Sequence, residues 1–236
     1  KFEFKKNYSI VMKIFGLIQA RCGSKRLPNK VLKLIKGKST IEHIYNRMKS
    51  SKIFSQIIIL TSRSKKDDKI IQLCKKKKYN FFRGSHKNVS SRFYNVCKNN
   101  NFEFFFRANA DSPLLDISII KNKISYTKKF DIITNCYKKT YPKGQSIELI
   151  SKKIFINSFK KFKKKQHLEH VTKYFYDNKK KYKIFNFELK RNLNNKYNFC
   201  IDTNKDLLRI KKIFKKINKT NVNKIKYTKL LKIYEN

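Results

Sequence analysis

The chain has 236 residues, with 60 lysines and arginines against 15 aspartates and glutamates, and a formal net charge of +45. Hydrophobic residues make up 40% of the chain and aromatic residues 14%, which is enough for a sizeable core and argues against wholesale disorder. No stretch approaches the roughly 18–20 apolar residues of a membrane span. We therefore expect one large folded domain without a membrane span.

The excess positive charge allows two interpretations. A chain this basic should attract phosphate backbones, which is typical of a nucleic-acid-binding protein. However, the residues in excess are Lys, Asn, Ile, Phe and Tyr, which have A/T-rich codons, and only nine of the basic residues are arginines. Specific nucleic-acid readers favour the bidentate arginine fork, and here the lysines are spread along the whole chain. We therefore favour compositional drift over a dedicated nucleic-acid role.

The cysteines and the amino terminus indicate a cytoplasmic protein. The five cysteines are widely spaced and contain no C-x-x-C pair, which favours a reducing compartment over a disulfide framework or a structural zinc site. The first apolar stretch is interrupted by Lys13 and lacks a secretory pattern. Residues 1–12 are expected to be an extension before the true start, since the first methionine is Met12.

In chain order, short apolar runs alternate with segments of helical period, which predicts an α/β domain with a mainly parallel sheet. The predicted strands of the first half are Lys13–Gln19, Gln56–Thr61, Asn80–Arg83, Glu103–Ala108 and Asp131–Thr134. The predicted helices between them are Thr40–Lys52, Lys66–Lys77, Val89–Asn99 and Ile119–Tyr126, the first with Ser39 or Thr40 as N-cap.

The second half has a less regular pattern. An extended segment is predicted at Ser146–Ile150, helices at Ser151–Lys164 and Glu169–Asp177, and strands at Tyr182–Leu189 and Tyr197–Ile201. The segment Lys205–Tyr234 reads as two amphipathic, lysine-rich helices.

The loop Gln19–Lys30 follows the first predicted strand, at the edge where open parallel sheets bind their ligands. It contains four cations, Arg21, Lys25, Arg26 and Lys30, together with Gly23 and Ser24. Backbone N–H groups and positive side chains in such a connection can surround a polyphosphate. The loop matches neither the P-loop nor the G-x-G-x-x-G pattern, and an ordinary basic loop is the alternative.

Two of the few acidic residues, Asp111 and Asp202, come at the ends of predicted strands on the same edge. Mg²⁺ is commonly held by one or two carboxylates together with substrate phosphate oxygens. The two aspartates and the cationic loop therefore suit a metal-bound nucleotide, although Asp202 could instead cap the helix that follows it.

The loop pattern Q-A-R-x-G-S-x-R-L-P-x-K resembles the opening signature of the cytidylyltransferases that make CMP-activated acidic sugars, the acylneuraminate and 3-deoxy-manno-octulosonate type. It is most similar to the branch of the spore coat polysaccharide biosynthesis protein SpsF. Further fragments resemble the family in the same order: Phe82–Ser85, Ser91–Tyr94, Arg107–Pro113, Tyr141–Gly144 with Glu148, Glu169–Thr172, and Ile201–Asp202 with Asp206. The resemblance covers about residues 13–206.

The resemblance implies a three-layer, Rossmann-like nucleotide-diphospho-sugar transferase fold with a less regular C-terminal half. It implies a single domain at 13–236, in which 140–200 form the acceptor and dimerisation region and 204–236 the C-terminal helices. The implied reaction transfers CMP from CTP to an acidic sugar, with Mg²⁺ as cofactor and release of pyrophosphate, in surface polysaccharide synthesis. A homodimer in the cytoplasm is the implied assembly.

The resemblance also assigns roles to residues. The implied catalytic residues are Arg21, Lys30 and Asp111, and the implied metal ligands are Asp111 and Asp202. Nucleotide binding is implied for Gln19, Ala20, Arg21, Gly23, Ser24, Lys25, Arg26, Lys30, Thr61, Arg83, Gly84 and Arg92. Acceptor binding is implied for Glu148, Glu169 and His170.

One departure from the family pattern concerns the loop backbone. Asn29 stands where glycine is common, and asparagine tolerates the left-handed conformation better than most residues. Three hypotheses remain open: this cytidylyltransferase, a nucleotidyltransferase of the same fold with another nucleotide or a non-sugar acceptor, and a basic nucleic-acid-binding protein. The two enzyme hypotheses require Asp111 and Asp202 to converge, whereas the third requires clustered basic residues with aromatic platforms.

Overall fold

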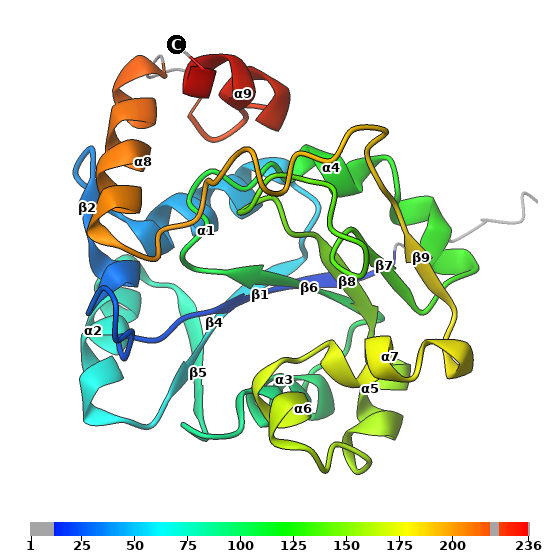
Figure 1. The fold of residues 1–236 in the computed structure, drawn as a ribbon. Helices are drawn as coiled ribbons and strands as arrows, with labels where there is room; N and C mark the ends of the chain where they lie inside the picture. Colours follow the sequence, from blue (N-terminus) through cyan, green and yellow to red (C-terminus); the bar gives the residue numbers. More distant parts are fainter. Residues whose placement is uncertain (1–11, 218–221, 236) are drawn as a thin grey trace, which may run out of the picture.

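The computed structural model describes residues 12–217 and 222–235, and its centre is a seven-stranded sheet (Figure 1). From one edge to the other the strands are β5 (Asn80–Gly84), β4 (Gln56–Ser62), β1 (Ile14–Gln19), β6 (Phe104–Asn109), β8 (Glu148–Ser151), β7 (Ile132–Thr134) and β9 (Ile184–Asn186). The first four strands are mutually parallel, and β8 runs antiparallel to both of its neighbours. A short antiparallel pair, β2 (Leu34–Ile35) and β3 (Lys38–Ser39), follows the first loop.

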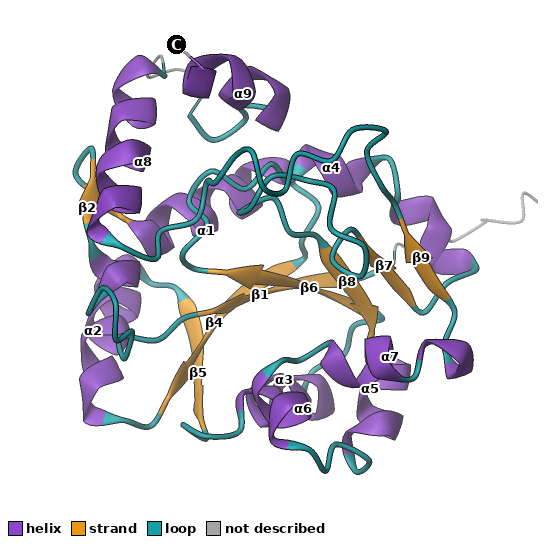
Figure 2. Cartoon of the chain, viewed as in Figure 1, coloured by secondary structure: helices purple, strands orange, loops and turns teal. Residues whose placement is uncertain are grey.

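Helices cover both faces of the sheet (Figure 2). They are α1 (Thr40–Ser51), α2 (Asp68–Lys77), α3 (Val89–Asn99), α4 (Ser118–Lys121), α5 (Lys152–Phe159), α6 (Lys165–Glu169), α7 (Lys173–Asp177), α8 (Asn204–Lys216) and α9 (Tyr227–Glu235). Short 3₁₀ turns lie at Lys30–Leu32, Lys65–Asp67, Ile124–Lys128 and Lys179–Lys181. This three-layer arrangement with a mainly parallel sheet confirms the predicted fold class.

Successive residues of the strands point to opposite faces of the sheet and belong to two separate hydrophobic clusters. In β1, Ile14 and Ile18 face one cluster with α1 and α2, whereas Phe15 and Leu17 face another with α3 and α5. Because successive strand residues point to opposite faces, a strand that is apolar throughout must be covered on both sides. The uninterrupted run Ile57–Leu60 of β4 divides between the same two clusters in the same way.

The regular first half agrees closely with the sequence prediction. Helix α3 has the predicted bounds, and α1 begins after Ser39 in a capping box. The Ser39 hydroxyl accepts from the N–H of Glu42, and the Glu42 carboxylate accepts from the N–H of Ser39 at 2.7 Å. Local capping chemistry therefore decides where this helix begins.

From Ile119 onward, the predictions were wrong in several places. The helix predicted over Ile119–Tyr126 divides into α4 and a 3₁₀ turn, and the helix predicted over Ser151–Lys164 ends at Phe159. In the segment predicted as helix over Glu169–Asp177, α7 begins at Lys173.

The predicted strand Tyr197–Ile201 is not a strand of the sheet. It makes an isolated bridge between Lys143 and Asn198, and the Ile201 N–H donates to the Asp111 carbonyl at 2.9 Å. Gly144 permits this crossing, because its φ is +91° and an added Cβ would lie 2.8 Å from the Phe199 backbone. The extended chain thus pairs with loops beyond the sheet and still delivers Asp202 to the edge of β1 and β6.

Helices α8 and α9 pack together over a third cluster that includes Leu27, Ile35 and Leu114 (Figure 1). The predicted C-terminal helix pair is therefore present, with residues 218–221 between the helices outside the described part. The expected extension at residues 1–12 lies outside it as well, except for Met12. Within the described ranges, no helix has the length and apolar character needed to cross a membrane.

Candidate active site

The site lies at the carboxyl ends of β1 and β6. Gln19 and Asn109, the last residues of these strands, are partners in the parallel register. The chain remains paired just beyond them: the Ala20 N–H donates to the Leu60 carbonyl at 2.9 Å, and the Ala110 N–H donates to Gln19 at 3.0 Å. Ala20 is buried, so its contribution is to the backbone of the loop. Two loops therefore leave the sheet side by side from fixed starting points.

The loop after β1 is held in shape by local hydrogen bonds. The Cys22 carbonyl accepts from the N–H of Ser24 at 2.9 Å and from the N–H of Asn29 at 3.1 Å, which closes the loop on itself. Asn29 has φ 56° and ψ 24°, as expected for an asparagine that replaces glycine at a left-handed position. The chain then enters the turn that begins at Lys30.

Asp67, in the 3₁₀ turn that follows β4, holds the same loop. Its buried carboxylate accepts from the Cys22 N–H at 2.7 Å, from the Ser62 N–H at 3.2 Å and from the Ser62 hydroxyl. Burial next to this carboxylate raises the pKa of the Cys22 thiol to about 11. The thiol is therefore a neutral packing group.

Lys30 brings the two predicted metal-ligating aspartates together. Its Nζ lies 2.7 Å from Oδ2 of Asp111 and 2.8 Å from Oδ1 of Asp202. Two carboxylates that share one ammonium group must lie close to each other. Burial alone lowers the pKa of Lys30, but the two carboxylates outweigh it and the net shift is upward. Lys30 is therefore a firmly charged cation between two acids.

Asp202 is free for this role because another residue caps α8. Thr203 is the N-cap and forms a capping box with Asp206, whose carboxylate also accepts from the Asp202 N–H at 3.1 Å. The alternative prediction of Asp202 as the cap was therefore wrong. Its side chain contacts Lys30 and, at 3.2 Å, Arg26 instead.

A cavity of about 480 Å³ lies over these groups. Its lining contains seven residues predicted for nucleotide binding, Gln19, Arg21, Gly23, Ser24, Lys25, Arg26 and Lys30, the two predicted metal ligands Asp111 and Asp202, and also Val31 and Asn109. Of its cations, Lys30 contacts both aspartates and Arg26 contacts Asp202. This mixture of cations and carboxylates gives the cavity the charge and polarity suited to a phosphorylated ligand with a metal ion.

A second cavity, of about 370 Å³, adjoins the first at Asn109. Its lining includes Glu148 and His170, two of the residues predicted for the acceptor, and Arg107. The third predicted residue, Glu169, lies 3.9 Å from Arg21 in an exposed ion pair.

Glu148 is buried and its oxygens are occupied. It pairs with Arg107 and accepts from the hydroxyls of Thr172 at 2.5 Å and Tyr176 at 2.8 Å. Burial and the neighbouring carboxylate raise the pKa of Tyr176 well above its ordinary value. Arg107 in turn reaches Gln19 and Asn109 through its Nη2, at 3.3 and 3.2 Å. Glu148 therefore positions Arg107 between the two cavities.

Besides Ala20, four predicted nucleotide residues lie apart from the lining of the first cavity. Thr61 is fully buried, Arg83 donates to the Ser62 carbonyl at 3.1 Å, and Arg92 donates to the Ser85 carbonyl at 2.8 Å. Gly84 leaves room for Arg92, since an added Cβ would lie 2.9 Å from its Cγ. Together they shape the loops after β4 and β5.

Sequence reasoning assigned no role to Asp67, Arg107, Asn109 or Tyr176. A signal existed for Asp67, because it is one of only 15 acidic residues and follows the second strand, where it could have been weighed like Asp111. No comparable signal marks Tyr176 among 13 tyrosines.

A family model described as Cytidylyltransferase matches residues 15–236. This chain belongs to the cytidylyltransferase family. The cytidylyltransferase is 38% identical over 213 residues to an uncharacterized protein of Methanocaldococcus jannaschii, with 88% of this chain and 86% of the relative covered. It is 28% identical over 210 residues to the spore coat polysaccharide biosynthesis protein SpsF of Bacillus subtilis, with 86% and 87% covered.

Among solved structures, the cytidylyltransferase is similar to one from Leptospira borgpetersenii. The TM-score is 0.87 and the sequence identity 27%, over 95% of this chain and 94% of the other. The match spans nearly all of both chains, so the two proteins share this fold.

Proposed function

We propose that this cytidylyltransferase transfers CMP from CTP to an acidic sugar of the nonulosonic type, with Mg²⁺ as cofactor, in the synthesis of a surface polysaccharide or glycan. The observation that carries the proposal is the meeting of Asp111 and Asp202 at Lys30, beneath the cationic loop. The name of the SpsF relative supports a role in polysaccharide synthesis.

The residues of the chain act mainly by positioning the triphosphate and neutralising its charge. A hydroxyl oxygen of the acceptor forms a bond to the α-phosphorus, the bond to the bridging oxygen of the β-phosphate breaks, and pyrophosphate leaves with the electron pair. Charge builds up on the phosphate oxygens, and Lys30 with Arg21, Lys25 and Arg26 lies where it can stabilise that charge. The hydroxyl proton passes to solvent.

The donor set fits a magnesium ion. Mg²⁺ keeps waters and takes only one or two protein carboxylates beside substrate phosphates, and Asp111 and Asp202 are two such carboxylates held together. In the described ranges, no cluster of three or more acidic, histidine or cysteine side chains could hold a metal on its own. The bound ion would polarise the phosphate and steady the leaving group. Lys30 would then turn from the carboxylates to the phosphates.

The cavity that adjoins the first through Asn109 is the proposed acceptor site. His170 and Lys173 line it and can face an anionic sugar, while Glu148 fixes Arg107 at its boundary with the nucleotide cavity. The homodimer and the role of residues 140–200 in dimerisation remain predictions beside this proposal.

The test is pyrophosphate release with CTP, ATP, GTP or UTP, with and without Mg²⁺, over a panel of nonulosonic acids and other acidic sugars. The proposal expects release with CTP and Mg²⁺ and one of the acids. A preference for another nucleotide, or for a non-sugar acceptor, would favour the same-fold alternative. No nucleotide preference together with no metal dependence would refute the proposal.

Nucleic-acid binding is the weaker candidate because aromatic platforms are lacking on the described surface. There, the exposed large aromatic side chains are Phe81 and Tyr126. Phe81 is in β5 at one edge of the sheet, and Tyr126 stacks on Phe185 of β9 at the other edge. They cannot form one continuous surface for stacked bases.

A further inference from the structure

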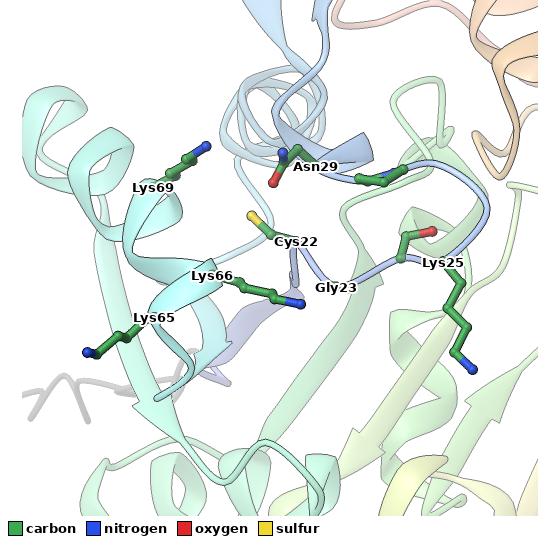
Figure 3. A pocket seen from close by; sticks show the side chains of 9 residues that line it. Cys22, Gly23, Lys25, Asn29, Lys65, Lys66 and Lys69 are labelled. Atoms are coloured by element: carbon green, nitrogen blue, oxygen red, sulfur yellow. The ribbon is translucent and has the colours of Figure 1, made fainter.

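Behind the nucleotide loop lies a third cavity, of about 610 Å³ (Figure 3). One wall is the loop, from Cys22 to Lys25 with Pro28 and Asn29. The other wall is Lys65, Lys66 and Lys69, at the start of α2 and the 3₁₀ turn before it. The volume is within the range of small-molecule sites, which is roughly 300–1,000 Å³.

The charge of this cavity has one sign. Its lining contains four lysines and no carboxylate. Figure 3 shows Lys66 extended toward Gly23 and Lys69 on the Asn29 side of Cys22, whereas Lys65 points away. Lys66 and Lys69 are therefore the two cations placed to meet a ligand between the helix and the loop.

The nearest acidic residues are committed to other partners. The Asp67 carboxylate faces Cys22 and Ser62, and Asp68 forms an ion pair with Arg83 at 2.7 Å. Across residues 12–217 and 222–235, no carboxylate lies within ion-pair distance of Lys65, Lys66 or Lys69. Lys65, Lys66 and Lys69 therefore stand together on one wall of the cavity without a compensating carboxylate.

We propose that this rear cavity is an anion site for a phosphate-bearing small molecule, distinct from the nucleotide cavity. Lysine binds phosphate as a compact point charge, and the amino end of the ten-residue helix α2 adds to the positive potential. Gly23, Ser24 and Lys25 line both cavities, so an anion behind the loop touches the same segment that faces the nucleotide. The site does not depend on which acceptor or nucleotide the enzyme uses.

The experiment is calorimetric titration of inorganic pyrophosphate into the full chain in EDTA at 0.15 M salt. The comparison is between the wild type, the double variant Lys66→Ala/Lys69→Ala, and the matched control Lys75→Ala/Lys76→Ala. The control removes the same charge from the other end of α2. Pyrophosphate is expected to bind both cavities of the wild type and the control. In the double variant the affinity for the pyrophosphate bound behind the loop should fall about tenfold or more, because two cations that would form charge-assisted hydrogen bonds with it are lost.

The outcomes separate this site from the proposed function. The inference is overturned if only one pyrophosphate binds per wild-type chain. It is also overturned if the affinity for pyrophosphate falls equally in the double variant and in the control, because that would show diffuse attraction to net charge. CTP binding in the double variant reports on the nucleotide cavity alone. If CTP does not bind at all, but removal of Lys66 and Lys69 still weakens the binding of pyrophosphate behind the loop, the proposed function fails and the anion site stands.

Discussion

Replacement of Lys30 by methionine tests the centre of the site. The substitution keeps an unbranched side chain of similar length and removes the charge between Asp111 and Asp202, whose oxygens lie 2.7 and 2.8 Å from the Lys30 Nζ. The two carboxylates would then face each other with only the exposed Arg26 beside Asp202. Like charges at such a distance repel, so the folded state should lose stability.

The magnitude follows from how exposed the three side chains are. Breaking a fully buried ion pair costs roughly 3–5 kcal/mol, whereas an exposed pair contributes about 0–1 kcal/mol. Lys30, Asp111 and Asp202 are 13%, 23% and 35% exposed, between these limits. We expect a loss of about 1–3 kcal/mol in the free energy of unfolding. Turnover should fall about 10²–10³-fold, because one donor to the phosphate charge is lost.

The assay is thermal unfolding of the wild type, Lys30→Met and the control Lys33→Met, with and without Mg²⁺. Lys33 belongs to the same segment, is exposed, and forms no ion pair on the described surface. With the lysine gone, a divalent cation is the natural replacement between the two carboxylates. Mg²⁺ should therefore raise the Tm of Lys30→Met more than that of the other two proteins. Equal stability of all three without metal, or an equal response to Mg²⁺, would refute the reasoning.

Three further predictions concern single residues. Asp111→Asn should reduce kcat about 10²–10³-fold in the pyrophosphate assay with the circular dichroism spectrum unchanged, and retained turnover would remove Asp111 from the metal site. Asn29→Val should lower the free energy of unfolding by about 1–2 kcal/mol, since φ is 56° there, whereas Asn29→Gly should be nearly neutral. Glu42→Gln should cost about 1 kcal/mol near pH 7, because glutamine can still complete the capping box but loses the charge that pairs with Lys77 and with the amino end of α1. Burial opposes ionisation of Glu42, but hydrogen bonds from Ser39 and Lys77 lower its pKa below the usual 4.5. The stabilisation by the Glu42 carboxylate is therefore complete above pH 4.5 and is lost as the pH falls through the lowered pKa. In urea unfolding, the difference in stability between the wild type and Glu42→Gln should be smaller at pH 3 than at pH 7.

The first half of the fold could be predicted because local and tertiary signals agree there. The strand Gln56–Ser62 is an apolar run covered on both faces, and α1 begins at a capping box that the sequence displays directly. In the second half the elements are short and the deciding contacts are distant. The segment Tyr197–Ile201 has the composition of a strand, but its backbone partners are Lys143 and Asp111. No local pattern contains that information.

In the candidate site, too, the residues of a local motif could be predicted from the sequence and the residues that meet through distant contacts could not. The loop from Gln19 to Lys30 is one contiguous motif, so its cations could be assigned together. The ion pair between Arg107 and Glu148 joins residues 41 positions apart, and the hydroxyls of Thr172 and Tyr176 that complete it come from α7 and the turn before it. Their roles depend on the antiparallel insertion of β8 next to β6, which the helical and strand periods do not encode.

In a chain with four times as many basic as acidic residues, the positions of the carboxylates are the more informative. A lysine on this surface needs no partner, because water solvates it at little cost, and so most lysines carry no information about function. A buried carboxylate must have donors, and each buried or half-buried one near the site holds a particular group. Asp67 holds the loop at Cys22, Glu148 holds Arg107, and Asp111 with Asp202 holds Lys30. The cations with such partners are fixed in the site. Lys66 and Lys69 instead line a cavity whose lining contains no carboxylate.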